Sequence, residues 1–225
     1  MTRVTRLQIA PSILAADFAN LADAVGAVAG VTDTLHVDVM DGHFVPNLSI
    51  GPPVVKALRG VTALHLDCHL MMTNPGQYLE AFKKAGADSC TVHVEIGATH
   101  ELINQMRELG LGVGLALNPD RTFADVAPFL ADIDMLLVMS VFPGFGGQSF
   151  IPDVLDTVKA ARAEIDRTGV GVVIQIDGGI DAHTIGSAAI AGATNFVAGT
   201  AVFGQPDPAA AVTALQAAAQ GAVGS

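Results

Sequence analysis

Three short apolar stretches of the sequence each carry histidine or aspartate near one end. His36 and Asp38 lie two residues apart in TLHVDVMDG. His69 lies in LHLDCHLMM, and Asp177 comes directly before two glycines in GVVIQIDGG. A charged carboxylate in apolar surroundings is costly unless it is paired or coordinated, and two nearby carboxylates repel each other until one is protonated. A divalent cation would remove both penalties.

The mixture of two imidazoles and two carboxylates limits the choice of metal. It suits Zn²⁺, Fe²⁺, Co²⁺ or Mn²⁺, whereas Mg²⁺ and Ca²⁺ prefer shells made of oxygen atoms. The alternative is that His36 and His69 are core histidines whose ring nitrogens are satisfied by hydrogen bonds. Four such residues near the ends of three apolar segments favour the metal site.

Glycine-rich sequences follow the last three apolar segments of the chain. Glycine lets the backbone turn its N–H groups toward an anion, so these corners predict a phosphate site. The first corner, PGFGGQ, is expected to lead into a helix that begins near Ser149. The alternative is that the glycines only permit tight turns. The residues concerned are Gly144, Gly146, Gly147, Gly178, Gly179, Gly199 and Thr200.

The charge and hydropathy of the chain exclude several classes of partner. Asp and Glu number 22 against 11 Lys and Arg, a net charge of −11. No basic surface for nucleic acid or anionic lipid is therefore expected. Hydrophobic residues make up 51% of the chain, but no run approaches the roughly 18 apolar residues of a membrane span. We expect no nucleic acid and no membrane partner.

The cysteines and the amino-terminal stretch bear on the compartment. Cys68 and Cys90 are the two cysteines, too few for a disulfide framework, which fits a reducing compartment. The stretch MTRVTRLQIAPSIL lacks the apolar core and the cleavage site of a signal peptide. We therefore expect a cytoplasmic protein.

Runs rich in Val, Ile and Leu alternate with amphipathic stretches along the whole chain. Strands that alternate with helices pair in parallel through right-handed crossovers. We therefore expect an α/β fold, a (β/α)₈ TIM barrel in which residues 1–225 form a single catalytic domain. An open, doubly wound sheet is the alternative. The expected strands span residues 8–14, 34–42, 64–72, 89–95, 112–118, 135–141, 171–179 and 195–203.

The barrel hypothesis predicts where the polar residues meet. Active sites of such barrels lie at the C-terminal ends of the strands. His36, Asp38 and Met40 alternate along one expected strand, so their side chains point the same way. His69 and Met71 do so on the next strand. These side chains are therefore expected to converge on one rim.

For other polar residues the sequence gives weaker evidence of a direct role in the site. Asp67 is expected deeper in the barrel, behind the metal ligands. His93 and Glu95 are interpreted as a structural hydrogen-bonded pair. Asp41 and His43 lie in the following loop, where substrate contact and simple solvation are both open.

Taken together, these segments resemble the ribulose-phosphate 3-epimerase family over nearly the whole chain. The similarity begins with IAPSILAADFANL and HVDVMDGHFVPN and continues through LHLDCHLMM, MSVFPGFGGQSF, IDGGI and VAGTAVFG. The combination of HVDVMDGHFVPN with PGFGGQ is highly specific. The resemblance implies a barrel of the ribulose-phosphate binding type.

The family implies a role for each matching residue. One divalent metal ion per subunit, with Zn²⁺ expected ahead of Fe²⁺, Mn²⁺ or Co²⁺, would be held by His36, Asp38, His69 and Asp177. Asp38 and Asp177 would also be the catalytic acid–base pair. The substrate-binding positions would be Ser12, Met40, His69, Met71, Met139, Gly144, Gly146, Gly147, Asp177, Gly178, Gly179, Gly199 and Thr200.

Two positions depart from the family pattern. Phe142 stands where Asn or Glu is common, and Thr200 replaces a common Ser. Threonine keeps the hydroxyl, so phosphate binding should survive. Phe142 touches none of the four proposed ligands, and its effect on a neighbouring contact is open.

The implied reaction interconverts D-ribulose 5-phosphate and D-xylulose 5-phosphate by proton transfer at C3 through a 2,3-enediolate. The nearest alternative is an epimerase of a six-carbon ketose phosphate such as D-allulose 6-phosphate. A decarboxylase or aldolase is less favoured, because no Lys lies near the end of an expected strand. A non-catalytic metal and phosphate sensor is a third possibility. By resemblance we expect a homo-oligomer, a dimer or a hexamer.

Overall fold

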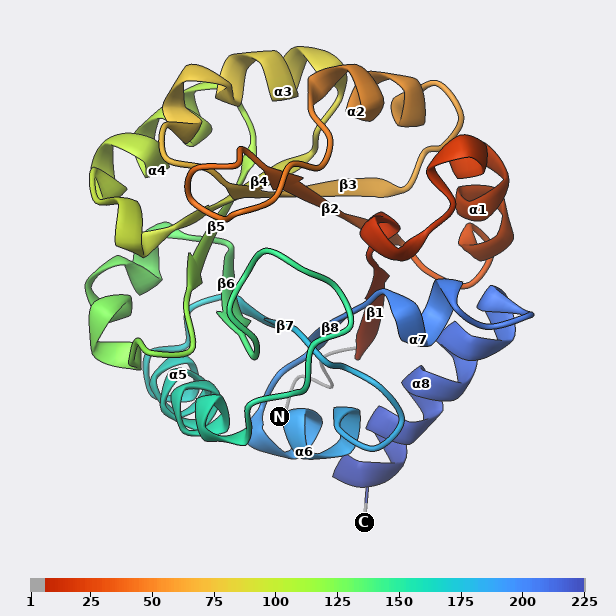
Figure 1. Cartoon of the computed structure of the whole chain (residues 1–225). Helices are drawn as coiled ribbons and strands as arrows, with labels where there is room; N and C mark the ends of the chain where they lie inside the picture. The colour runs from red at the N-terminus through yellow and green to blue at the C-terminus, as the bar shows by residue number, and fades with distance from the viewer. Residues whose placement is uncertain (1–6, 225) are drawn as a thin grey trace.

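The computed structural model describes residues 7–224, and its centre is a ring of eight parallel strands (Figure 1). The hydrogen-bonded order is β1-β8-β7-β6-β5-β4-β3-β2, which confirms the expected TIM barrel. The strands are β1 Gln8–Pro11, β2 Thr34–Met40, β3 His65–Met71, β4 Ser89–His93, β5 Gly112–Leu117, β6 Met135–Met139, β7 Val173–Asp177 and β8 Asn195–Ala198.

Helices surround the ring, as Figure 1 shows. The α-helices are α1 Leu21–Val28, α2 Pro52–Arg59, α3 Leu79–Ala85, α4 Thr99–Glu108, α5 Leu155–Thr168, α6 Ile185–Ala191, α7 Thr200–Phe203 and α8 Pro208–Val223. Short 3₁₀ helices are η1 Ile13–Ala15, η2 Phe18–Asn20, η3 Pro75–Gln77, η4 Val94–Ile96, η5 Phe123–Asp125, η6 Ala127–Asp132 and η7 Pro152–Val154. Among the described residues, no helix is both long and apolar enough to cross a membrane.

The two ends of the strand order meet at a seam. β1 pairs with β8 over four residues, and β2 pairs with β3 over seven. Between β1 and β2 the structure has an isolated bridge, Ser12 to His36. The Ser12 hydroxyl also donates to Asp38 Oδ2 at 2.5 Å. Side chains of the candidate site therefore help to close the barrel.

The strands separate an apolar outer layer from an interior that contains both polar and apolar side chains. Outward residues such as Val37, Cys68 and Leu115 pack against the helices in the main hydrophobic core. The interior positions include buried polar side chains, among them Asp67 and Gln175, which are joined by a 2.9 Å hydrogen bond. Because buried polar groups need partners, this interior is a hydrogen-bonded network that reaches up toward the rim.

Several sequence-based boundaries are wrong. The eighth strand ends at Ala198, and Thr200–Phe203 forms α7 instead of continuing it. The helix expected near Ser149 begins as η7 at Pro152, and α5 starts at Leu155. The sixth apolar run is preceded by the 3₁₀ segments η5 and η6, without an α-helix between β5 and β6.

Two of the helical segments that begin with a proline are preceded by residues that make different contacts. Asp207 caps α8, because its side chain accepts a hydrogen bond from the Ala210 amide. Asn74 precedes a 3₁₀ turn and makes no side-chain cap hydrogen bond.

Candidate metal and active site

The structure brings the four predicted metal ligands together at the C-terminal rim of the barrel. His36 and Asp38 come from β2, His69 from β3, and Asp177 is the last residue of β7. One ligand atom from each residue lies within 4.8 Å of the others. Asp38 Oδ1 is 3.3 Å from His36 Nε2 and 3.1 Å from His69 Nδ1. Asp177 Oδ2 is 4.0 Å and 3.9 Å from the same two nitrogens.

This cluster fits a divalent cation on two grounds. His36 Nε2 is buried and has no hydrogen-bond partner among the described residues, which is costly for a polar atom. Ligands at about 2.0–2.1 Å from a tetrahedral ion lie roughly 3.3 Å apart. The observed separations between carboxylate oxygens and imidazole nitrogens, 3.1–4.0 Å, are close to that spacing. The donor set, two nitrogens and two oxygens, suits zinc and its transition-metal neighbours.

The two carboxyl groups differ in protonation. Burial alone would raise the pKa of Asp38, but the facing His36 and His69 imidazoles outweigh it and hold that pKa well below its usual value. Burial and the negative charge of Asp38 raise the pKa of Asp177 to about 7. Burial lowers the pKa of His36, yet the charges of Asp38 and Asp67 outweigh it and raise that pKa well above 6.5. The site therefore holds one ionised and one readily protonated carboxyl.

Asp67 contacts the ring nitrogen of His36 that points away from the ligand cluster. Its Oδ2 lies 3.0 Å from His36 Nδ1 and accepts a 2.9 Å hydrogen bond from Gln175. Its Oδ1 accepts from the Ser89 hydroxyl at 3.1 Å. A carboxylate on the outer nitrogen fixes the ring so that the inner nitrogen faces a metal. Asp67 therefore lies behind the ligands, as the sequence predicted.

His69 has a different neighbour on its far side. Its Nε2 lies 2.8 Å from His93 Nε2, and His93 Nδ1 lies 3.2 Å from Glu95 Oε2. The sequence indicated the His93–Glu95 pair, and the structure contains it, although Glu95 belongs to η4 and not to β4. The contact with His69 was missed. The sequence could have predicted this contact, because Ser89, Thr91 and His93 alternate along β4 and so share its inward face.

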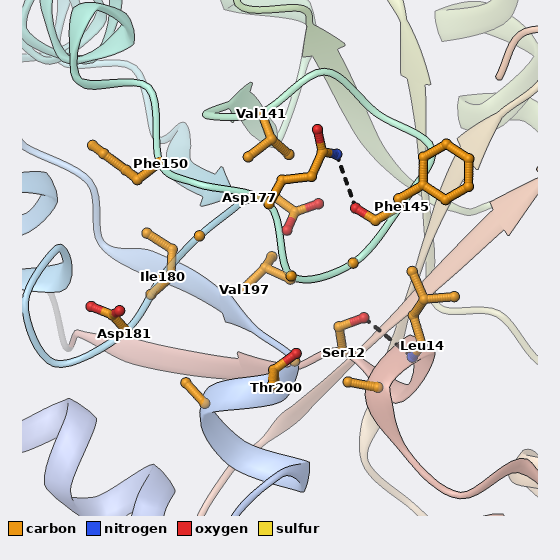
Figure 2. A pocket seen from close by; sticks show the side chains of 18 of the residues that line it. Ser12, Leu14, Val141, Phe145, Phe150, Asp177, Ile180, Asp181, Val197 and Thr200 are labelled. Carbon is orange, nitrogen blue, oxygen red and sulfur yellow. Dashed lines mark hydrogen bonds between the residues drawn. The ribbon is translucent and has the colours of Figure 1, made fainter. Parts of the chain in front are cut away.

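An open cavity of about 1370 Å³ lies over this rim, and Asp38 is part of its wall. Figure 2 shows Ser12, Asp177 and Thr200 reaching it from different parts of the ring. Among the described residues that line it, neither His36 nor His69 appears, so His69 lies behind the surface that a substrate would contact. The other predicted substrate positions line the cavity: Ser12, Met40, Met71, Met139, Gly144, Gly146, Gly147, Asp177, Gly178, Gly179, Gly199 and Thr200.

The loop from β6 to α5 covers part of the cavity and includes several lining residues that the sequence did not single out. Gln148 donates to the carbonyls of Phe142 and Phe145 at 2.7 and 3.0 Å (the second is drawn in Figure 2) and so holds the loop in shape. Phe142 itself is 52% exposed and lies outside the ligand cluster, so its departure from the family pattern leaves that cluster unchanged. Asn47 Nδ2 donates to the Gly144 carbonyl at 2.8 Å and ties this loop to the one after β2.

Gly178 and Gly179 serve close packing as well as lining the cavity. Both have positive φ, +122° and +62°. A Cβ at Gly178 would lie 2.6 Å from Val141 Cγ2, and one at Gly179 would lie 2.6 Å from the Phe150 amide nitrogen. The tight-turn interpretation therefore holds for this pair. By contrast, nothing lies within 4 Å of a Cβ built at Gly146 or Gly147.

Comparison with known proteins agrees with the geometry. Residues 8–203 match the profile of the Ribulose-phosphate 3 epimerase family. The chain is 51% identical over 211 residues to the ribulose-phosphate 3-epimerase of Mycobacterium tuberculosis H37Rv, covering 92% of this chain and 91% of that relative. It is 42% identical over 227 residues to the cytoplasmic isoform of ribulose-phosphate 3-epimerase from Oryza sativa, covering 98% of both chains.

Solved structures show the same fold at low identity. A crystal structure of KGPDC from Streptococcus mutans superposes with a TM-score of 0.74 at 15% identity, covering 95% of this chain and 97% of that one. This likeness supports the barrel and nothing finer. The profile match and the two relatives decide the family: the chain belongs to the ribulose-phosphate 3-epimerase family.

Proposed function

We propose that this protein interconverts D-ribulose 5-phosphate and D-xylulose 5-phosphate. The observation that carries the proposal is the pair of carboxyl groups Asp38 and Asp177, which lie together on the wall of one cavity. Epimerisation at C3 needs one group to remove a proton and a second to deliver one to the opposite face. The relatives named for this reaction support the substrate.

We assign the two oxygens of each carboxyl group different roles. Asp38 Oδ1 and Asp177 Oδ2 face the histidines, which leaves Asp38 Oδ2 and Asp177 Oδ1 for proton transfer. In one direction Asp38 removes the C3 proton beside the C2 carbonyl, and Asp177 delivers its proton to the other face of the resulting 2,3-enediolate. The Ser12 hydroxyl, bonded to Asp38 Oδ2, orients that oxygen. Reversal exchanges the two roles.

The metal site would support this chemistry. His36 Nε2, Asp38 Oδ1, His69 Nδ1 and Asp177 Oδ2 would hold one divalent ion, with Zn²⁺ expected first from the donor set. A bound ion supplies positive charge beside the substrate oxygens as they become negative.

The glycine corners and Thr200 are proposed to receive the phosphate, since they line the same cavity. Met40, Met71 and Met139 line its buried end and would exclude water there. Residues 1–225 would act as one catalytic domain. The homo-oligomer and the cytoplasmic location stay predictions; the latter rests partly on residues 1–6, which lie outside the described part of the chain.

The test is to incubate the metal-loaded protein with D-ribulose 5-phosphate in D₂O and to follow C3 by NMR. Deuterium entering C3 while D-xylulose 5-phosphate accumulates is the expected result. No exchange, with bound metal confirmed, would overturn the proposal. Turnover of D-allulose 6-phosphate in its place would identify the six-carbon alternative.

A further inference from the structure

Two buried imidazoles and a partly buried carboxylate, His69, His93 and Glu95, form a line that starts at the candidate metal site. His69 Nδ1 faces the ligand cluster, and its Nε2 lies 2.8 Å from His93 Nε2. His93 Nδ1 continues to Glu95 Oε2 at 3.2 Å. Both imidazoles are buried, at 0% and 1% exposure, and the Glu95 side chain is 10% exposed. None of these contacts is needed to hold β3 against β4, which have their own ladder.

Counting protons along this line fixes every donor and acceptor. A hydrogen bond between two Nε2 atoms contains one proton, so one ring donates and the other accepts. If His69 Nδ1 is to bind a metal it must be unprotonated, and the neutral ring then carries its proton on Nε2. His93 must therefore accept at Nε2 and carry its own proton on Nδ1. That proton requires an acceptor, and Glu95 Oε2 is one.

The second carboxylate oxygen of Glu95, Oε1, also has neighbours that fix its hydrogen-bonding role. Glu95 Oε1 accepts a 2.6 Å hydrogen bond from the backbone N–H of Asn118, and Arg121 Nε lies 3.9 Å away. Both neighbours are donors, so only an oxygen suits this position. A carboxylate offers an oxygen on both sides, toward Asn118 and toward His93, whereas an amide offers one.

We propose that His93 and Glu95 are positioning residues that hold His69 in the tautomer whose Nδ1 is free to bind the metal. The inference rests on the proposed metal site. The two ligand histidines are then oriented differently: His36 by the carboxylate of Asp67 directly, and His69 by a carboxylate acting through a second imidazole. The ring of Phe44, with its centroid 4.7 Å from that of His93, fixes the intermediate ring from the side.

The test is the substitution Glu95→Gln, which keeps the shape of the side chain. Its amide oxygen must face Asn118, so its NH₂ group faces His93 Nδ1 and requires that atom to accept. The donor pattern then reverses along the line, and His69 is driven to carry its proton on Nδ1. Zinc affinity, measured by chelator competition, should fall roughly 10- to 100-fold, as for other outer partners of metal ligands. Glu101→Gln, at an exposed position on α4, is the matched control and should bind zinc as the wild type does.

Two further measurements keep the test decisive. Nitrogen-15 NMR of the zinc-loaded wild type should show the proton of His93 on Nδ1 and that of His69 on Nε2. His93→Gln, which keeps an acceptor toward His69, should bind zinc more tightly than His93→Leu. Wild-type affinity in folded Glu95→Gln, or the opposite tautomers in the wild type, would overturn the proposal. A wild type that binds no zinc would instead overturn the metal site of the proposed function.

Discussion

Asp38 and Asp177 carry the same functional group, and their surroundings give them different chemistry. Asp38 faces two imidazoles, which stabilise its ionised form. Asp177 lies against Asp38, and repulsion together with burial favours its protonated form. Two carboxyl groups whose pKa values are driven apart can act as base and acid at one pH. The division of roles at the site therefore follows from neighbours rather than from residue type.

The first prediction concerns turnover. Asp177→Asn removes one of the two proton-transfer groups and should lower kcat by about 10²- to 10⁴-fold. Metal content must be measured in the same sample, because the substitution also weakens one ligand. Asp153→Asn, at an exposed position before α5, is the control and should keep wild-type turnover. Near-wild-type kcat in metal-loaded Asp177→Asn would show that another residue transfers the proton.

The second prediction concerns pH. A metal bound to His36 Nε2 must displace the proton that the raised pKa of His36 favours on that ring. Apparent metal affinity should therefore increase with pH, by about tenfold per unit for each displaced proton. In the metal-free protein the sign is opposite: the folded-state pKa of Asp177 exceeds its ordinary value of 3.8, so its contribution to stability declines as pH rises from 3.8 to about 7. Chelator competition across this range measures the first effect, and affinity independent of pH would contradict it.

The turn after β7 shows how an element positions the site. Its two glycines let the chain pass directly beneath the loop after β6, while the buried Ser140 hydroxyl donates to the carbonyls of Asp177 and Gly178 at 2.9 and 2.6 Å. This bonding holds the end of β7, and with it the carboxyl group of Asp177 that we propose to be catalytic, against β6. The orientation of Asp177 is thus set by two adjacent elements.

The third prediction compares two glycines. Gly178→Ala should displace the loop after β6, because the new Cβ would lie 2.6 Å from Val141 at a φ of +122°. The left-handed backbone alone costs roughly 1–2 kcal/mol, and KM should rise with the loss of stability. Gly26→Ala, inside α1 and with nothing within 4 Å, should instead stabilise by about 0.5–1 kcal/mol. Denaturant unfolding of both variants measures the difference, and equal effects would refute the packing role.

The elements also show what periodicity can and cannot locate. His36 and Asp38 could be placed on one face because alternation along a strand is a local property. The end of the eighth strand could not be placed, because NFVAGTAVF is mostly apolar and short apolar runs fit strand and helix equally. The start of α5 was misplaced since Ser149 and Phe150 are held by loop contacts far away in sequence, such as the approach of Phe150 to Gly179. The His69–His93 contact likewise depends on the pairing of β3 with β4.

At the scale of the whole molecule, the ligand cluster connects distant parts of the ring. Its residues come from β2, β3 and β7, and the path from β7 to β2 runs through β8, β1 and the seam. A bound ion would join both sides of that seam. Ring closure and metal binding are therefore linked.

The fourth prediction follows from this linkage. A ligand at a hundredfold excess over its Kd stabilises the folded state by about 2.7 kcal/mol, and each kcal/mol shifts Tm by roughly 2–4 °C in a chain of this size. Removal of zinc by a chelator should therefore lower Tm by about 5–10 °C. His36→Gln, which lacks one ligand, should respond much less. An unchanged wild-type Tm after confirmed metal loss would separate the ion from ring closure.

The seam between β1 and β2 differs from every other junction between neighbouring strands of the barrel. The other seven junctions are ladders of backbone hydrogen bonds, whereas this junction has one isolated bridge together with side-chain hydrogen bonds, among them Ser12 to Asp38 and Thr32 to the Ile9 carbonyl. The contacts that close the ring therefore involve residues of the candidate site. Under mildly denaturing conditions we expect this seam to open first, which would move the carboxyl groups of the site apart while the other strands stay paired. The protein would then lose its activity before it unfolds globally.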